Sequence, residues 1–376
     1  MLAVRSGNLK WTGCPRDAGN GKEDPLCRKV LEHFRASPDC PPDWPDDWRP
    51  ECPPQVRRES TIHQLGSRHW NKVICLKIIT RPGRKSPDAR QLHAALLHYH
   101  ARSDHEQGFT VPRPYGCIPE LGAVIMEWVE GKTFGELLKK EQFNTRKRHE
   151  DIRKVAGWLR WFHSQSDFQP ASVADGKQLE VIIKVFEENS GLKPAATAHD
   201  PMLRRFIGIA GRHAAVLDEV EVDSAILHGD FKPTNLLFSG KGTVVGIDFL
   251  GVRRGPVIQD ICRFLIDLDF YRNLVRRSYA LSPGSRSNDF EAFLSAYGGQ
   301  VGRISRPAFV YLYFLSVLSA LVHQRKKFKP GARLKVRLAI FRSIANQLVG
   351  EILEESRDKQ VKRVRFGWLR QPKLPT

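Results

Sequence analysis

The segment that most constrains the fold is a strand-rich stretch inside an otherwise helical second half of the chain. Residues 225–249 read AILHGDFKPTNLLFSGKGTVVGIDF, with two short apolar runs on either side of the turn at Ser239–Gly242. Two apolar runs joined by a glycine-containing turn indicate a β-hairpin. A hairpin brings together the residues that precede its first strand and those that follow its second strand.

The polar residues at that end of the hairpin suggest a metal site. Asp230 and Asn235 precede the first apolar run, and Asp248 follows the second. Carboxylate and amide oxygens suit Mg²⁺, which proteins hold with one or two carboxylates together with substrate phosphates. If the two aspartates only capped turns, the position of Asn235 would be an accident. We therefore predict that the three side chains converge on a Mg²⁺ site.

The first part of the chain has strand patterns, and the part after Phe134 is helical. Residues 72–79 and 123–129 are apolar and β-branched and predict strands, while 89–100 has apolar residues at helical spacing. We predict later helices at residues 134–141, 147–164, 177–188, 202–219, 288–297, 307–323 and 333–357. A β-rich part followed by a helical part predicts an α+β protein with two lobes.

Composition divides the chain into four segments. Residues 1–58 are rich in Pro, Gly and Asp and predict an irregular N-terminal arm. We then expect a β-rich N-lobe at 59–130, a helical C-lobe at 131–324, and a basic C-terminal helix and tail at 325–376.

The formal net charge of +19 is concentrated near the C-terminus. Residues 325–376 hold fifteen Lys or Arg and four Asp or Glu, so this segment supplies 15 − 4 = +11 of the total. We therefore expect no specific nucleic-acid partner for the whole protein. The basic C-terminus could contact an anionic surface, and a solvated tail is the alternative.

The sequence also indicates a compartment. Its seven cysteines form no CxxC pair and no disulfide framework. The N-terminus lacks an apolar run before its first charges, so we expect no secretory signal. The longest apolar stretch, Ala308–Val322, is shorter than the roughly 20 residues of a membrane span. These features predict a cytoplasmic protein.

The motif His228-Gly229-Asp230 with Asn235, followed by Ile247-Asp248-Phe249, resembles the aminoglycoside phosphotransferase and choline kinase family. Members of this family are small-molecule kinases. Other segments resemble it as well, namely VICLK around Lys77, Ile125–Gly131, Val155–Ser164, Gly255–Phe264 and Glu291–Gly298. The resemblance implies a bilobal protein-kinase-like fold, with a small β-rich N-lobe and a larger, mainly helical C-lobe.

The resemblance also implies catalytic roles. Asp230 would accept or orient the proton of the substrate hydroxyl, and Lys232 would reach the γ-phosphate of ATP. Asn235 and Asp248 would hold the Mg²⁺ ions that bridge the phosphates. Phosphoryl transfer requires mainly positioning and charge neutralisation, which these residue types supply.

The nucleotide-binding residues expected from the resemblance lie earlier in the chain. Lys77 would neutralise the α- and β-phosphates, and the backbone of Glu127 and Val129 would hydrogen-bond adenine. We expect the phosphate loop at Leu65–Asn71, where Ser67 and backbone N–H groups would approach the phosphates. This loop is not glycine-rich.

The sequence therefore predicts an ATP- and Mg²⁺-dependent kinase acting on a hydroxyl of a small molecule or carbohydrate. The basic composition favours a neutral or anionic acceptor over a polycation. A protein serine/threonine kinase is one alternative, although Gly229 replaces the arginine typical of its catalytic loop. A catalytically weak pseudokinase scaffold is another, because Gln91 stands where the family usually has a glutamate that pairs with the strand lysine.

Overall fold

The computed structural model describes residues 24–57, 59–80, 88–140, 144–172, 177–192, 201–214, 220–240, 242–249, 253–276, 288–298, 306–325 and 332–358. The chain forms two compact units. Unit 1 comprises Met1–Leu137 and Thr234–Arg253, and unit 2 comprises Leu138–Pro233 and Arg254–Thr376. The hairpin predicted for the C-lobe therefore groups with unit 1. The first 23 residues of the predicted arm and the tail from residue 359 lie outside the described residues.

Unit 1 contains a mainly antiparallel sheet in the order β1-β3-β4-β7-β6. Its strands are β1 (Arg49–Pro50), β3 (Ser60–Ser67), β4 (Lys72–Ile79), β7 (Ala123–Glu127) and β6 (Pro114–Ile118), and β2 (Gln55–Val56) also pairs with β3. The central strand β4 coincides with the predicted strand at 72–79, which is confirmed. Its β-branched, apolar sequence suits a strand with neighbours on both sides.

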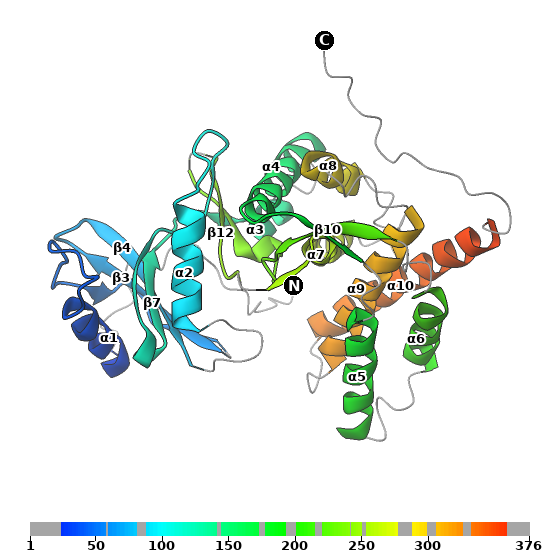
Figure 1. The fold of residues 1–376 in the computed structure, drawn as a ribbon, viewed down its shortest axis with the longest axis horizontal. Coiled ribbons are helices and arrows are strands. Elements are labelled where there is room, and N and C mark those ends of the chain that lie inside the picture. Colours follow the sequence, from blue (N-terminus) through cyan, green and yellow to red (C-terminus); the bar gives the residue numbers. More distant parts are fainter. Residues whose placement is uncertain are drawn as a thin grey trace, which may run out of the picture. The chain divides into compact units, whose positions relative to one another are not determined.

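Helix α2 (Ala89–His100) lies against this sheet, where it contacts β6 and β7 (Figure 1). The helix begins at a capping box, in which the Asp88 carboxylate accepts from the Gln91 N–H and the Gln91 side chain accepts from the Asp88 N–H. Leu92, Leu96 and Tyr99 are buried on the face toward the sheet. The predicted helix at 89–100 is confirmed.

The prediction of an irregular arm is wrong for residues 24–57. Helix α1 (Pro25–Arg35) begins at Asp24, whose carboxylate accepts from the Leu26 N–H, and it contacts β6. Cys27, Val30 and Phe34 are buried at helical spacing, and β1 and β2 extend the sheet. A composition rich in Pro and Asp hid this pattern, although both residue types are common at helix starts.

An aromatic cluster holds α1 and the following segment on the sheet. Phe34 packs edge-on against Trp44 with ring centroids 4.8 Å apart, and Trp44 packs against Trp70 at 5.1 Å. A Cβ atom at Gly116 of β6 would collide with the Phe34 ring, so this close approach requires glycine. The cluster explains why a segment with few regular backbone hydrogen bonds folds onto unit 1.

A second sheet in unit 1 contains the predicted hairpin. Strand β11 (Leu236–Phe238) pairs antiparallel with β12 (Val244–Gly246), with Leu236 opposite Gly246. The sheet order is β5-β12-β11-β8, where β5 is Phe109–Thr110 and β8 is Lys132–Thr133. The hairpin is confirmed. It continues past the strands, because the Ile247 N–H donates to the Asn235 carbonyl at 2.9 Å.

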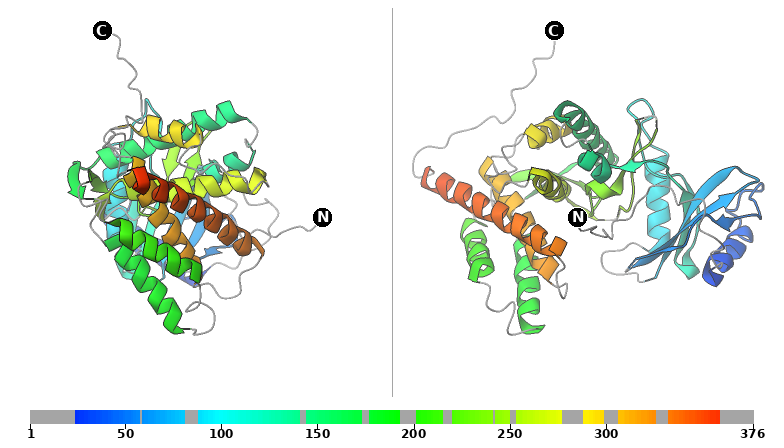
Figure 2. Two further views of the ribbon diagram at one scale, coloured as in Figure 1. Left: turned by 90° about the vertical axis from the view of Figure 1, so that its right-hand side faces the viewer. Right: turned by 180° about the vertical axis from the view of Figure 1, so that it is seen from behind.

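Unit 2 is mainly helical. After α3 (Phe134–Lys140), which crosses the boundary between the units, its helices are α4 (Thr145–Ser164), α5 (Lys177–Leu192), α6 (Pro201–His213), α7 (Ile258–Arg276), α8 (Asn288–Tyr297), α9 (Arg306–Arg325) and α10 (Ala332–Asp358). A small sheet has the order β13-β10-β9, from Arg254–Pro256, Glu221–Ile226 and Gln169–Ser172. Within this unit α9 contacts α5, α6, α7 and α10 (Figure 2).

Two helices of unit 2 show what the sequence pattern revealed and missed. Helix α7 was not predicted, because its apolar side chains are buried on several sides and give no single-faced period. Helix α10 was predicted, and its apolar residues between Ile340 and Ile352 are buried against α9 and α7. None of the helices in the described residues is both long and apolar enough to span a bilayer.

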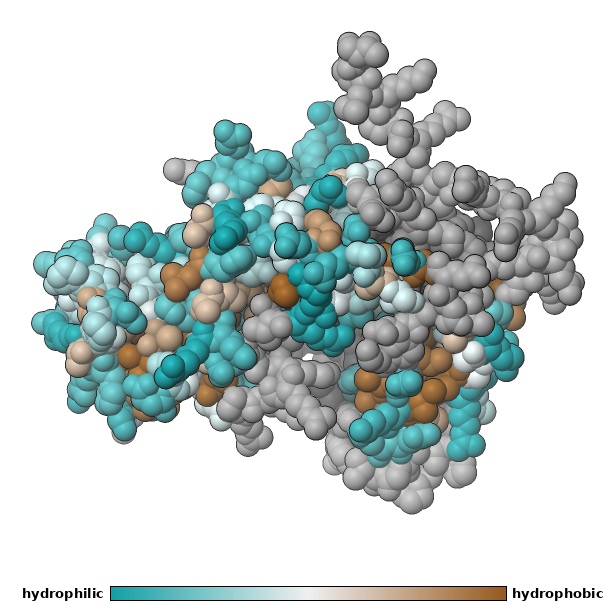
Figure 3. Space-filling model, viewed as in Figure 1, coloured by the Kyte–Doolittle hydropathy of each residue, from teal (hydrophilic) through white to brown (hydrophobic). Residues whose placement is uncertain are grey.

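Apolar side chains also reach the surface of unit 2 where α5 and α6 pack together (Figure 3). Val181 of α5 is 51% exposed. Isolated apolar residues of this kind are common on soluble proteins.

The aromatic cluster makes a testable contribution to stability. We expect Phe34→Ala to lower the free energy of unfolding of unit 1 by about 3 kcal/mol or more, because it removes a fully buried ring and leaves a cavity. The matched control is Phe168→Ala, which removes a ring that is 39% exposed and should cost well under about 1 kcal/mol. Denaturant unfolding followed by tryptophan fluorescence measures both. Equal effects of the two substitutions would contradict the packing described here.

Candidate active site

The far end of the β11–β12 hairpin holds two of the predicted metal ligands. Asn235 is buried at the end of the short 3-10 turn Pro233–Asn235, and Asp248 follows β12. Asp248 has a φ of +58°, in the left-handed region that few residues other than glycine adopt. Such a conformation persists only where the surroundings enforce it, and it marks Asp248 as a candidate functional residue.

Two cations contact the carboxylate of Asp248. Lys77 Nζ lies 2.8 Å from Oδ1, and Arg57 Nη1 lies 2.6 Å from Oδ2. Burial alone would raise the pKa of Asp248, but the charges and hydrogen bonds of Lys77 and Arg57 outweigh it and hold that pKa well below its usual range. Asp248 is therefore an anion throughout the physiological pH range.

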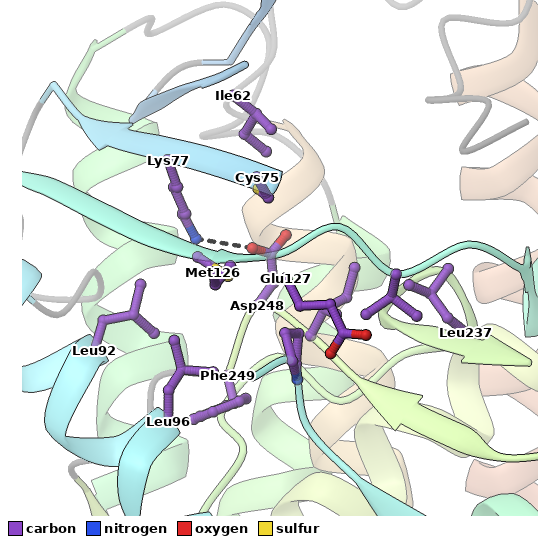
Figure 4. A pocket seen from close by; sticks show the side chains of 13 residues that line it. Ile62, Cys75, Lys77, Leu92, Leu96, Met126, Glu127, Leu237, Asp248 and Phe249 are labelled. Atoms are coloured by element: carbon purple, nitrogen blue, oxygen red, sulfur yellow. Dashed lines mark hydrogen bonds and ion pairs between the residues drawn. The ribbon is translucent and has the colours of Figure 1, made fainter. Parts of the chain in front are cut away.

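These residues border a pocket that lies entirely within unit 1 (Figure 4). The pocket contains about 490 Å³ of empty space, including its open mouth. Its lining is mainly apolar and is formed by Ile62, Cys75, Lys77, Leu92, Leu96, Pro112, Met126, Glu127, Val129, Leu237, Ile247, Asp248 and Phe249. An apolar pocket with a few converging polar groups is typical of small-ligand sites.

The pocket wall includes Glu127 and Val129, whose backbone the sequence predicts to hydrogen-bond adenine. The Glu127 N–H donates to the Arg113 carbonyl at 2.8 Å, while the Arg113 N–H donates to the Glu127 carboxylate at 3.2 Å. In a regular antiparallel ladder the Arg113 N–H would donate to the Glu127 backbone carbonyl. Here the Glu127 carboxylate accepts this hydrogen bond instead. Val129 packs against Leu237 and Ile247 of the hairpin.

Helix α2 provides no carboxylate to Lys77. Gln91, at the position where a glutamate was expected, is occupied by the capping box at the helix start. The residues that α2 turns toward the pocket are Leu92 and Leu96, and Lys77 pairs with Asp248 instead (Figure 4). Gln91 therefore does not take the role of the expected glutamate. The carboxylate that pairs with Lys77 is that of Asp248, which follows β12.

The expected position of Ser67 in the phosphate loop is corrected by the strand register. Lys77 lies opposite Ile62, whereas Ser67 lies opposite Lys72 at the other end of the β3–β4 pair. Ser67 does not line the pocket, and its hydroxyl donates to the Asp47 carboxylate at 2.5 Å. The turn at Leu65–Asn71 is close to Lys77 in the sequence, but the register places it at the other end of the β3–β4 pair.

Arg57 is the functional candidate that the sequence did not reveal. It follows β2 at the turn into β3, and its N–H donates to the Ser60 carbonyl at 2.8 Å. The only sequence signal was a short charged stretch between Val56 and Ser60, which is common in loops. Its proximity to Asp248 depends on pairing between strands far apart in the chain.

In unit 2, the segment that carries Asp230 is held by a buried carboxylate. Asp260, near the start of α7, accepts from the His228 N–H at 2.6 Å and the Gly229 N–H at 2.9 Å. His163 Nε2 lies 3.2 Å from the same carboxylate. Burial would raise the pKa of Asp260, but the hydrogen bond and charge of His163 and the nearby backbone donors lower it overall.

Asp230 itself is partly buried and faces two cations of unit 2. Lys232 forms an ion pair with it, and Arg263 of α7 lies 3.4 Å from its Oδ1. His228 is fully buried among aromatic rings that include Phe231 and Trp158. Asp230 and Asn235 belong to different units, so the structure describes the predicted set as a pair in unit 1 and a separate acid in unit 2.

Solved structures with a similar fold are small-molecule kinases. Choline kinase LicA from Streptococcus pneumoniae is 15% identical over 78% of this chain and 91% of that chain, with a TM-score of 0.51. A glucosamine kinase is 15% identical over 81% and 95% of the two chains, with a TM-score of 0.52. A putative aminoglycoside phosphotransferase from Ralstonia eutropha is 11% identical over 87% and 98%, with a TM-score of 0.52.

These likenesses show that the chain has the bilobal protein-kinase-like fold that the sequence predicts. A search of curated proteins finds no match. The model of the phosphotransferase enzyme family matches residues 68–280, which is more than half of the chain and contains Lys77, Asp230 and Asp248. The chain is therefore a member of the phosphotransferase enzyme family.

Proposed function

We propose that this protein is an ATP- and Mg²⁺-dependent kinase that transfers the γ-phosphate to a hydroxyl of a small molecule or carbohydrate. The observation that carries the proposal is the pair formed by Lys77 and Asp248 at 2.8 Å on the wall of an apolar pocket. Lys77 comes from the central strand of the sheet, and Asp248 has the left-handed backbone that aims its carboxylate there. Lys77 is a cation that can bind phosphate, and Asp248 is an ionised carboxylate that can bind a metal. Together they suit a nucleoside triphosphate.

The apolar part of the pocket is the proposed adenine site. Cys75, Met126 and Leu237 provide flat, uncharged walls, and burial raises the pKa of the Cys75 thiol to about 12, so it stays neutral. The Glu127 carbonyl and the Val129 backbone are the proposed hydrogen-bonding partners of the base. The hydrogen bond from the Arg113 N–H to the Glu127 carboxylate supports this role, because it leaves the Glu127 backbone carbonyl available to the base.

Asn235 and Asp248 are the proposed Mg²⁺ ligands, and their chemistry fits this ion. Both present oxygen donors, and the hydrogen bond from the Ile247 N–H to the Asn235 carbonyl keeps them at the same end of the hairpin. Bound Mg²⁺ would neutralise charge on the phosphate oxygens. Lys77 would contact the α- and β-phosphates beside this site.

Asp230 is the proposed group that accepts or orients the proton of the acceptor hydroxyl, and Lys232 is the proposed partner of the γ-phosphate. Asp260 positions their loop, since its carboxylate fixes two consecutive N–H groups just before Asp230. A loop held in this way loses little freedom when substrate binds, which is the main contribution a protein makes to phosphoryl transfer.

A neutral or anionic acceptor is supported by the charges around Asp230. Lys232 and Arg263 both contact its carboxylate. A polycationic acceptor would meet repulsion from this pair. Screening ADP release against neutral, anionic and cationic hydroxyl compounds tests this choice, and a cytoplasmic location is proposed with it.

A nucleotide-binding scaffold without transferase activity is the second candidate. Both cations at the nucleotide pocket pair with the proposed metal ligand Asp248, and α2 contributes only Leu92 and Leu96 there. Binding of Mg·ATP without phosphate transfer to any acceptor or to protein substrates would favour this candidate.

The role of Asp230 predicts a separation of binding from chemistry. We expect Asp230→Asn to lower ATP-dependent transfer by about 10² or more, because the proton of the acceptor hydroxyl loses its partner. Stabilisation of the protein by Mg·ATP in a thermal-shift assay should persist, since this substitution lies outside the nucleotide pocket. Turnover within twofold of the unsubstituted protein would contradict the assignment.

The role of Asp260 predicts a loss of loop order. We expect Asp260→Asn to lower the free energy of unfolding by about 2 kcal/mol and to reduce turnover, because the amide has one acceptor oxygen for a site that receives several donors. Asp167→Asn, at an exposed aspartate of the same unit, is the control and should change neither property. Denaturant unfolding and steady-state kinetics measure the two effects. Unaltered turnover in Asp260→Asn would show that the loop does not depend on this carboxylate.

A further inference from the structure

The first hairpin of unit 1 brings an arginine into contact with the pocket residue Asp248 and has no glycine-rich loop. Strands β1 and β2 both pair antiparallel with β3, and the turn between β2 and β3 is closed by the hydrogen bond from the Arg57 N–H to the Ser60 carbonyl. In the β3–β4 register, Ile62 lies opposite Lys77. The turn at Arg57 is therefore at the end of β3 that lies near Lys77.

The Arg57 side chain reaches from this turn to Asp248. Its Nη1 lies 2.6 Å from Asp248 Oδ2, while Lys77 Nζ occupies the other carboxylate oxygen at 2.8 Å. The side chains of Arg57 and Asp248 are each 23% exposed, so solvent reaches part of this pair. Two cationic side chains thus contact one carboxylate, one on each of its oxygens.

We propose that Arg57 is a phosphate-binding residue of the nucleotide site and exchanges Asp248 for the phosphate groups of ATP. This inference rests on the proposed function and adds one phosphate-binding residue to the proposed nucleotide site. Guanidinium groups bind phosphate through two parallel N–H donors, a geometry that an ammonium group lacks. Between Arg49 and Ser67 the only glycine is Gly66. The first hairpin therefore contacts phosphate through this side chain instead of a run of glycine backbone.

The opposite turn of β3 provides a contrast within the same sheet. At the β3–β4 turn, the Asp47 carboxylate accepts from the Ser67 hydroxyl at 2.5 Å, from the Arg68 N–H at 2.8 Å and from the His69 N–H at 3.2 Å. These donors, which would suit a phosphate, are engaged by a side chain of the protein itself. Arg68 is exposed at this turn and is a matched control for Arg57.

The test compares nucleotides that differ in phosphate number. Binding of adenosine, AMP, ADP and ATP, with and without Mg²⁺, is measured by calorimetry for the full chain and for Arg57→Gln, Arg57→Lys and Arg68→Gln. We expect Arg57→Gln to weaken ATP and ADP binding about tenfold or more, the scale of a charge-assisted hydrogen bond. Adenosine binding should stay within twofold. Arg57→Lys should fall between Arg57→Gln and the unsubstituted protein, and Arg68→Gln should match the latter.

Several results would overturn the proposal. Unchanged or tighter ATP binding by Arg57→Gln would show that Arg57 only restrains Asp248, and an equal loss for adenosine would show a general defect in the pocket. An equal loss for Arg68→Gln would assign the effect to overall charge. If Arg57→Gln does not fold, as judged by thermal unfolding, Arg57→Lys decides, and ATP affinity equal to that of the unsubstituted protein overturns the proposal.

The same titrations separate this proposal from the proposed function. If the unsubstituted protein binds ATP and Arg57→Gln binds it equally well, the role of Arg57 fails and the kinase assignment stands. If the unsubstituted protein binds none of the nucleotides, both fail together.

Discussion

The ion pairs of the Asp248 carboxylate with Lys77 and Arg57 are the interaction on which the pocket of unit 1 depends. A largely buried carboxylate is costly unless cations and donors compensate it, and here Lys77 of β4 and Arg57 of the turn between β2 and β3 do so. The left-handed conformation of Asp248 is maintained against its intrinsic cost because both carboxylate oxygens are engaged. The pair also joins the β11–β12 hairpin to the main sheet of unit 1, so its geometry fixes one wall of the pocket.

Unit 2 uses a second buried carboxylate in a different way. The Asp260 carboxylate is compensated by His163 and by the N–H groups of His228 and Gly229. Because these are largely backbone donors, Asp260 holds the shape of the loop that leads to Asp230. The charge of Asp230 is instead paired with Lys232 and Arg263. The two units thus prepare the proposed metal site and the proposed catalytic acid separately, each with its own electrostatic support.

The absence of a glutamate on α2 changes how Lys77 is positioned. In a kinase that has this glutamate, movement of the helix can make or break the ion pair with the strand lysine. Here Leu92 and Leu96 occupy that face of α2, so the helix contributes apolar surface to the pocket and not charge. Control of Lys77 instead passes to Asp248 and therefore to whatever ligand competes for this carboxylate.

By itself, the sequence determined the family, the α+β class and most of the helices. It also singled out Lys77, Asp230, Asn235 and Asp248 as candidate site residues, because local motifs and patterns mark these positions. Only the tertiary structure decided that residues 24–57 belong to the folded unit, that Ser67 does not line the pocket, and that Arg57 contacts Asp248. These outcomes depend on strand register and on contacts such as Arg57 with Asp248, which are 191 positions apart. Local pattern carries no information about such pairings, because they are set by how the whole sheet packs.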